Sequence, residues 1–257
     1  MNAEPRSDGT VGKALDVLDL VAGFGRPVRF SEVLEASTFP KATTYRLLQT
    51  LSSQGMLAHD SEAGTYAPGL RLVRMAHAAW SQSSLAPIAR PHLDALSAAV
   101  GQTVHLAQLD GGQVLYLDKR NAARPVPMFS EAGKVGPAYC TGVGKAMMAW
   151  LPEAALDAVL ARQSWHAFTP ATITGPDAMR TELASIRDAG FAEDREEHEP
   201  GIRCVAMPVL SAGGRVLGAV SVTGGGEMRD HLPSLRRAVA DIAGDLRDWR
   251  FPDQGEG

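Results

Sequence analysis

The chain has 257 residues, of which 45 % are hydrophobic and 21 % are charged, so it is long enough for two domains with real cores. Its formal net charge of −4 argues against a globally basic coat for nucleic acid. The two cysteines, Cys140 and Cys204, show no zinc-finger spacing, and no segment has the apolar length of a signal peptide or a membrane span. We therefore expect a cytoplasmic protein that needs no metal, no cofactor and no membrane.

The first domain is expected to cover residues 10–69 and to consist mainly of helices. Apolar periodicity and turn residues predict, in order, a helix over 11–22, a very short strand at 28–30, a helix over 31–36, a turn at 38–40 and a helix that begins after Pro40 and ends before Gly55. Helix, helix, turn and helix within this length form the helix-turn-helix pattern.

The helix after Pro40 carries two different faces. The face that we expect to pack on the core recurs at helical spacing and consists of Ala42, Tyr45, Leu48 and Leu51. The first two turns also carry polar residues that lie mostly off this face, namely Lys41, Thr43, Thr44 and Arg46. A buried rear and a cationic, hydroxyl-bearing front end are what a helix in the DNA major groove needs.

A hairpin and a linker are predicted to follow this helix. Two short extended runs at 56–59 and 65–67 flank a polar turn that contains glycine, which indicates a hairpin. Directly after a recognition helix, such a hairpin is a wing. A further apolar stripe of helical spacing begins at Leu70, and we expect a linker helix over residues 70–83.

The second domain is expected to cover residues 84–250 and to mix helices with antiparallel hairpins. The patterns predict helices over 85–100, 142–150, 153–161, 177–188 and 232–249, and strands over 103–109, 113–119, 191–195, 205–210 and 216–223. Gly101 and Gly190 are expected to stop two of these helices, and a capping box from Thr174 to Asp177 is expected to start one. This mixture indicates an α+β sheet domain.

Three stretches of the chain resemble the IclR-type bacterial transcription regulators, which are named for the isocitrate lyase regulator. PKATTYRLLQTLSSQGML resembles the recognition helix of that family and its exit into the wing. YCTGVGKAMMAWLP resembles the T-x-x-G-K-A segment of the family, and DREEHEPGIRCVAMPVL followed by GRVLGAVSVTG resembles the signature of its effector domain. The likeness runs from about Val11 to Trp249.

The resemblance implies an α+β architecture in which a winged helix-turn-helix is joined by a linker helix to a GAF-like effector-binding domain. It also implies homodimers, often paired into tetramers, on double-stranded operator DNA. The function implied is control of a neighbouring metabolic operon, typically a catabolic one, in response to a small organic acid or an aromatic compound.

Four residues of the recognition helix are candidates for DNA contacts. Arg46 can present a planar fork to guanine O6 and N7, and Thr43 can meet a base edge or a thymine methyl group. Lys41 and Thr44 suit phosphates, which position the helix without reading sequence. By analogy with the family, Lys41, Thr43 and Arg46 face the bases, and Ala42 stands where the family often has serine. The alternative is an ordinary core helix with a solvated front.

The resemblance also places an effector pocket between the sheet and the loop-helix segment above it. Its residues would be Met128, Gly142, Val143, Asp194, Ile202, Cys204, Ser221 and Thr223. Free N–H groups at the start of the helix from Gly142 can hold a carboxylate. Ser221 and Thr223 alternate by two, so both hydroxyls share one face of a strand. Asp194 is expected to accept a hydrogen bond from a ligand, or to hold a loop through Arg203.

Two alternatives to a ligand-responsive regulator stay open. Cys140 and Cys204 could serve a redox or metal sensor, although a buried thiol is more often inert. His105 and the run Glu196-Glu197-His198 invite a catalytic interpretation in an enzyme fused to a DNA-binding domain. No nucleophile elbow or Walker loop supports that interpretation, and we expect His198 in a charged surface turn.

Overall fold

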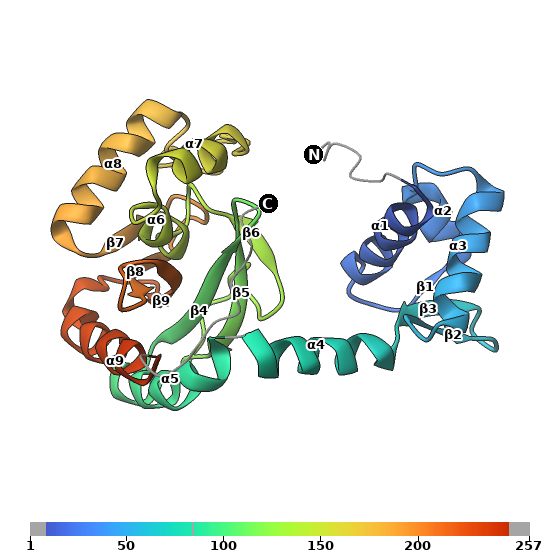
Figure 1. Ribbon diagram of the computed structural model, residues 1–257, viewed down its shortest axis with the longest axis horizontal. Helices are drawn as coiled ribbons and strands as arrows, with labels where there is room; N and C mark the ends of the chain where they lie inside the picture. Colours follow the sequence, from blue (N-terminus) through green and yellow to red (C-terminus); the bar gives the residue numbers. More distant parts are fainter. Residues whose placement is uncertain (1–8, 84, 247–257) are drawn as a thin grey trace. The chain divides into compact units, whose positions relative to one another are not determined.

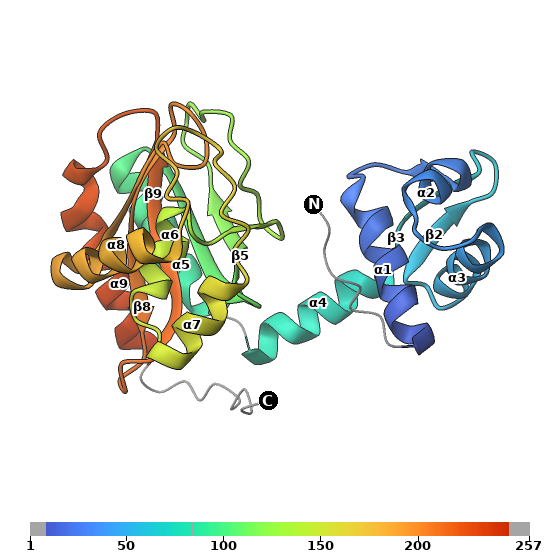
Figure 2. The ribbon, with the colours of Figure 1, turned by 90° about the horizontal axis from the view of Figure 1, so that it is seen from above.

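A computed structural model describes residues 9–83 and 85–246 and divides the chain into two compact units between Gln82 and Ser83. The helices and strands of both units are shown in Figure 1 and, from above, in Figure 2. Within the described ranges, no helix combines the length and the apolar character that a membrane crossing requires.

The N-terminal unit is a small helical domain with a three-stranded antiparallel sheet. In chain order its elements are α1 (Gly9–Gly23), β1 (Val28–Arg29), α2 (Phe30–Ala36), α3 (Lys41–Ser53), β2 (Leu57–Asp60), β3 (Thr65–Pro68) and α4 (Leu70–Ser83). The strands are ordered β1-β3-β2, and β2 with β3 forms the predicted wing. The core joins three helices through apolar side chains such as Val21 of α1, Val33 of α2 and Leu48 of α3, all of them fully buried.

The C-terminal unit is built on a six-stranded antiparallel sheet. Its helices are α5 (Ala86–Val100), α6 (Gly142–Met148), α7 (Glu153–Ala161), α8 (Pro176–Ala189), the short 3-10 helix η1 (Arg229–His231) and α9 (Leu232–Asp245). Its strands are β4 (Thr103–Asp110), β5 (Gln113–Arg120), β6 (Val135–Pro137), β7 (Ala192–Arg195), β8 (Arg203–Leu210) and β9 (Val216–Gly224). The spatial order is β6-β5-β4-β9-β8-β7.

Helices cover both faces of this sheet. One face packs on α5 and α9, while α6, α7 and α8 lie over the other (Figures 1 and 2). Side chains alternate accordingly along each strand: Val104 and Leu106 of β4 join the core with α5 and α9, whereas Ala107 joins the core with α6. The sequence prediction of an α+β domain with antiparallel hairpins is confirmed.

Two glycines allow α6 to approach the sheet closely. A Cβ atom on Gly144 would lie 2.5 Å from Ala138 Cα and 2.7 Å from its carbonyl carbon, and one on Gly142 would collide with the Cys204 thiol. Any side chain at either position would push the helix away from the backbone beneath it. These glycines therefore fix the depth of the space between the start of α6 and strands β7 and β8.

The predicted element ends need three corrections. The helix predicted over 142–150 ends at Met148, and α9 ends at Asp245, while residues 247–249 lie outside the described part of the chain. The capping box is wrong, because α8 starts after Gly175 without a side-chain cap and Pro176 already supplies a suitable first residue. Gly101 and Gly190 do end their helices, each in the left-handed conformation that glycine adopts without strain.

Candidate DNA-binding and effector-binding sites

The front of α3 presents a small cationic surface. Lys41 and Arg46 are exposed, Thr43 is half-buried, and Ala42 lies between them on the exposed side. Among the described residues, no carboxylate forms an ion pair with Lys41 or Arg46, so both cations are available to a phosphate or a base edge. The predicted candidates Lys41, Thr43 and Arg46 are thus placed together on one accessible helix end.

Thr44 was expected to bind phosphate, and this expectation is wrong. The side chain is fully buried, and its hydroxyl lies 3.2 Å from the carbonyl oxygen of Phe39 and 3.3 Å from that of Pro40. A third contact at 3.3 Å joins it to the Ser37 hydroxyl. Thr44 therefore holds the turn between α2 and α3 against the helix start and cannot reach DNA.

Tyr45 was expected in the core, but 52 % of it is exposed. The buried stripe of α3 consists of Thr44, Leu47, Leu48 and Leu51, which follow the spacing i, i+3, i+4, i+7. The predicted stripe took every third residue from Ala42 to Leu51, a spacing that drifts across a helix of 3.6 residues per turn, so it included the exposed Ala42 and Tyr45 and omitted the buried Leu47. Tyr45 stands edge-on to Phe30, with ring centroids 5.8 Å apart, and joins the exposed surface beside Arg46.

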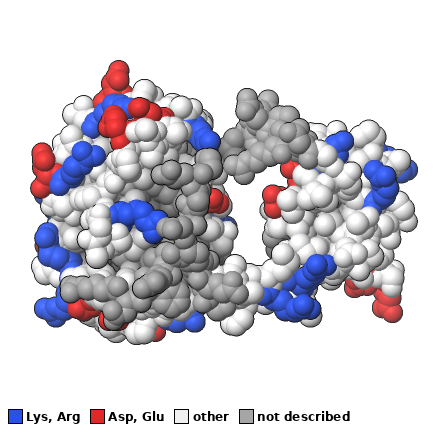
Figure 3. Space-filling view, in the orientation of Figure 1, with Lys and Arg blue, Asp and Glu red and all other residues white. Residues whose placement is uncertain are grey.

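The tip of the wing is acidic. Asp60 accepts hydrogen bonds from the backbone N–H groups of Glu62 and Ala63, at 2.9 and 3.1 Å, and so closes the turn between β2 and β3. The carboxylates of Asp60 and Glu62 would both repel a phosphate backbone. Acidic and basic side chains are also mixed over the described surface seen in Figure 3. Affinity for DNA must therefore come from localised cations such as those of α3.

We expect Arg46→Ala to abolish operator-specific binding, because one bidentate contact to guanine accounts for about 1–3 kcal/mol of discrimination between bases. Lys41→Ala is expected to weaken binding to all sequences and to flatten its salt dependence. Gel shifts with operator and scrambled DNA measure both effects. Thr44→Val serves as the matched control and should keep sequence preference, since its hydroxyl faces the protein. Wild-type preference in Arg46→Ala would refute the assignment.

A pocket in the C-terminal unit lies between the sheet, the start of α6 and the loop before β6. Its cavity volume is about 30 Å³, enough for about two water molecules, so a ligand the size of an aromatic acid requires the walls of the pocket to move apart. All eight residues that were predicted for the effector site line it: Met128, Gly142, Val143, Asp194, Ile202, Cys204, Ser221 and Thr223. They come from separate parts of the chain that the sheet and α6 bring together.

A buried histidine forms the floor of the pocket. His105 Nε2 lies 2.8 Å from the Ser130 hydroxyl, and its Nδ1 lies 3.3 Å from the Ser221 hydroxyl and 3.2 Å from that of Thr223. Complete burial, aided by Lys119, lowers the pKa of His105 to about 3, so the ring is neutral. The expectation that Ser221 and Thr223 share one face is confirmed, since their hydroxyls are 3.3 Å apart.

Asp194 stands on the wall opposite the loop, on edge strand β7. It is only 7 % exposed, and its Oδ1 accepts a hydrogen bond of 2.8 Å from the Glu197 N–H. Burial raises the pKa of Asp194 to about 7. The predicted pairing with Arg203 is wrong: that guanidinium binds Glu196 at 2.8 Å, because strand alternation turns Arg203 to a different side from Asp194.

Comparison with known proteins gives the family. A sequence model described as "Bacterial transcriptional regulator IclR C-terminal" matches residues 77–246, and one described as "IclR helix-turn-helix domain" matches residues 10–61. The chain belongs to the IclR family of bacterial transcriptional regulators. This family consists of DNA-binding regulators and not of enzymes.

Individual relatives agree with the family assignment. The HTH-type transcriptional regulator XynR of Escherichia coli is 35 % identical over 83 % of this IclR-family chain and 85 % of its own length. The Thermotoga maritima IclR crystal structure covers 93 % of this chain and 98 % of its own, with a TM-score of 0.73 and 29 % identity. An IclR homolog from Microbacterium hydrocarbonoxydans, complexed with 4-hydroxybenzoate, matches in fold with a TM-score of 0.82, 22 % identity and coverage of 93 % and 99 %.

Several pocket residues of this IclR-family chain were missed by sequence reasoning. The lining also contains His105, Tyr116, Phe129, Ser130, Thr141, His198 and Glu199. Alternation along β4 left the face of His105 open, and only its pairing with Ser221 in the β4–β9 register decides it. His198 was expected in a charged surface turn but is mostly buried, with its ring 5.4 Å from Phe129 and 4.7 Å from Phe168.

The thiols of this IclR-family chain do not favour the redox or metal alternative. Cys140 and Cys204 are both buried and unpaired with each other, and burial raises the pKa of each thiol well above its usual value. A thiol in that state carries no thiolate at neutral pH, and the thiolate is the form that reacts or binds metal. In the described ranges, no three His, Cys, Asp or Glu side chains gather in a way that could hold a metal ion.

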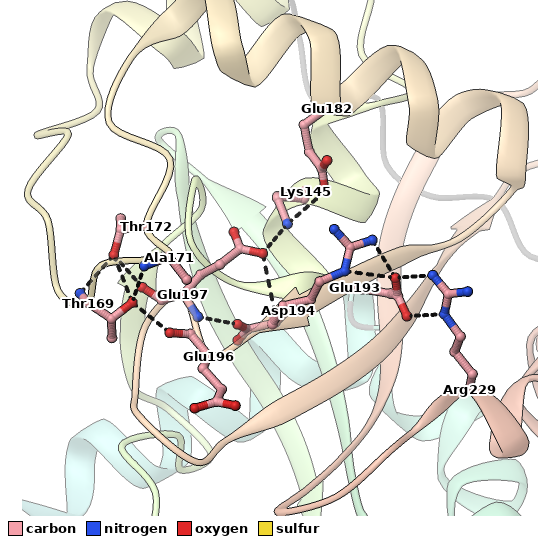
Figure 4. A network of polar contacts seen from close by, with 11 residues as sticks. Lys145, Thr169, Ala171, Thr172, Glu182, Glu193, Asp194, Glu196, Glu197 and Arg229 are labelled. Carbon is pink, nitrogen blue, oxygen red and sulfur yellow. Dashed lines mark hydrogen bonds and ion pairs between the residues drawn. The ribbon is translucent and has the colours of Figure 1, made fainter.

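Behind the pocket lies a buried ion-pair network (Figure 4). The ammonium group of Lys145 on α6 is fully buried and lies 2.6 Å from Glu197 and 3.0 Å from Glu182 of α8. Burial lowers the pKa of Lys145, but the two carboxylates outweigh it and the net effect is a raised pKa. The sequence places this lysine in the T-x-x-G-K-A segment but does not indicate its partners.

Proposed function

We propose that this regulator binds a specific operator next to a metabolic operon, typically a catabolic one. Its affinity for that operator would fall or rise when a small organic acid or aromatic compound occupies the pocket. The single observation behind the ligand is the convergence of eight predicted residues, from loop, helix and three strands, on one pocket. Hydroxyl, backbone and carboxyl groups there can orient a small polar ligand.

The operator would be bound by homodimers, or by such dimers paired as dimers of dimers, in the cytoplasm where the DNA is. Two copies of α3 would then meet half-sites about one DNA turn, or a multiple of it, apart. Ligand binding in the C-terminal unit would change how two linker helices present the two copies of α3. Such coupling requires that operator and ligand alter each other's affinity by the same factor.

The test begins with a thermal-shift screen of small carboxylates and aromatic acids on the full chain. 4-Hydroxybenzoate is included because a structural neighbour contains it. Any hit is titrated by calorimetry against the protein alone and against its complex with DNA from the promoter beside its own gene. We expect affinities that differ by about 5-fold or more, corresponding to a coupling free energy of about 1 kcal/mol. Equal affinities would refute regulation by that ligand.

A further inference from the structure

The pocket offers an acidic ligand no cation. Its described lining contains neither lysine nor arginine, and its charged members are the carboxyl groups of Asp194 and Glu199. Neither histidine supplies an imidazolium: His105 is neutral through burial, and burial also lowers the pKa of His198. An anion entering this pocket would therefore meet like charge if both carboxyl groups were ionised.

Two buried cations near the pocket are already paired, Lys119 with Glu131 and Lys145 with two carboxylates. Lys145 contacts Glu182 and Glu197, and neither its side chain nor those two carboxylates line the pocket. Figure 4 shows Asp194 on the far side of Glu197 from this ammonium group, joined to the network through the Glu197 N–H. One ammonium group thus faces three carboxyl groups in a region with little water, which is unfavourable unless one of the three holds a proton.

Asp194 is the carboxyl group placed to hold that proton. Glu197 is in direct contact with Lys145, and Glu182 is partly exposed to solvent. Of the two carboxyl oxygens of Asp194, only Oδ1 has a hydrogen-bond partner among the described residues. Oδ2 is therefore left for a proton and a ligand. Burial raises the pKa of Asp194 to about 7, and the Glu197 and Glu199 carboxylates act in the same direction.

Several titratable groups surround Asp194 and act on its proton. The Glu197 N–H and Lys145 lower its pKa, but less than burial and the two glutamates raise it. Further neighbours are Cys204 from β8, Cys140 before α6 and Tyr116 from β5, and the pKa of each is raised by burial, so all three are neutral. Arg195 and Arg229 bind Glu193 and leave Asp194 without an ion pair.

We propose that the pocket binds a monocarboxylate ligand together with one proton carried by Asp194, so that a hydrogen bond between two carboxyl groups replaces the missing ion pair. This inference rests on the proposed function, because it specifies how that same pocket takes an acid. Protonated Oδ2–H donates to the ligand carboxylate, which keeps its charge. Below about pH 7 the proton is already present, and above it the proton comes from the buffer. Hydrogen bonds of this kind to an ionised acceptor are short and strong.

Proton uptake can be counted directly by calorimetry on the full chain. Benzoate and 4-hydroxybenzoate are titrated at pH 8 in phosphate and in Tris, whose ionisation enthalpies differ widely. We expect close to one proton taken up per acid bound, falling toward zero at pH 6, and an affinity that weakens by about tenfold per pH unit above pH 7.5. Binding without proton uptake at pH 8, or with equal affinity at pH 6 and pH 8.5, would overturn the proposal.

Two variants assign the proton to a residue. Asp194→Asn keeps a donor in place without a titratable group, so its binding should become independent of pH and take up no proton. Glu199→Gln is the matched control, because it neutralises the other lining carboxyl group, and it should keep proton uptake at pH 8. If proton uptake persists in Asp194→Asn and vanishes in Glu199→Gln, the proton is not carried by Asp194, and the proposal is contradicted.

If neither acid binds, a pH titration of the protein without ligand tests whether Asp194 carries the proton. Carbon-13 NMR of labelled aspartate carboxyl groups in the full chain should show one resonance with a midpoint between pH 6 and 8 that is lost in Asp194→Asn. A midpoint below pH 5 would overturn the proposal. Release of promoter DNA by the acids is measured separately. Proton uptake without any effect on DNA binding contradicts the proposed function and leaves this inference standing.

Discussion

Gly144→Ala is expected to cost the C-terminal unit about 3 kcal/mol or more of its free energy of unfolding. A Cβ atom at this position would lie 2.5 Å from Ala138 Cα and 2.7 Å from its carbonyl carbon, and backbone atoms cannot rotate away. Overpacking in a dense core typically costs about 1–3 kcal/mol, and here the obstacle is rigid. The normal gain of replacing glycine by alanine in a helix, about 1 kcal/mol, is too small to compensate.

Gly142→Ala provides the matched comparison. Its added methyl group would collide with the Cys204 thiol, while the next atom, Ala206 Cβ, lies at a tolerable 3.4 Å. Removing the sulfur in Gly142→Ala with Cys204→Ala should therefore recover most of the lost stability, whereas Cys204→Ala should not rescue Gly144→Ala. Urea unfolding of the wild type, the three single variants and the two double variants measures this as two double-mutant cycles. A wild-type unfolding midpoint for Gly144→Ala would show that α6 does not press on Ala138.

Lys145→Met is expected to destabilise the C-terminal unit by about 3–5 kcal/mol, because it leaves Glu197 buried without its cation. One oxygen of that carboxylate is already buried without a hydrogen-bond partner in the described structure, and without the lysine the other oxygen keeps only the 3.4 Å contact from the Arg195 N–H. The loss should appear in the urea-unfolding midpoint at pH 7.5. It should shrink at pH 5, where Glu197, whose pKa is raised by burial, can take up a proton.

Two further variants test the cause of that loss. Lys145→Met combined with Glu197→Gln removes both charges, and we expect it to recover much of the stability, since deleting a whole buried pair costs far less than deleting one partner. Arg180→Met is the surface control: its guanidinium pairs with Glu153 and Asp157 near solvent, and exposed pairs contribute little. Equal losses in Lys145→Met and Arg180→Met would argue against a special role of burial.

The sequence predicted those parts of the fold that depend on local pattern. The Asp110-Gly111-Gly112 turn predicted the pairing of β4 with β5, and the start of α3 after Pro40 followed from a residue with a strong positional preference. The predicted face of α3 was wrong in phase because it took every third residue, whereas a helix repeats every 3.6 residues, so it included Tyr45 and omitted the buried Leu47.

The pocket residues were predicted at the positions that the family resemblance supplied. Residues whose contacts come from distant strands were missed. Nothing near His105 in the chain reveals that it meets Ser130 and Ser221. Lys145 has its partners on α8 and after β7, so its complete burial follows only from the packing of three segments. A charged residue such as Lys145 in an otherwise apolar helix indicates that it needs a partner, but the sequence does not identify that partner.

The alternation of side chains along β4 has a mechanical consequence. His105 forms the pocket floor, while its neighbours Val104 and Leu106 pack beneath the sheet against α5. Helix α5 begins at Ala86, and only two residues separate it in the chain from the last residue of α4. A ligand that displaces His105 would therefore also displace Val104 and Leu106, on which α5 packs, because all three residues belong to one strand. Stiffness in β4 would then set how much of such a displacement reaches α5.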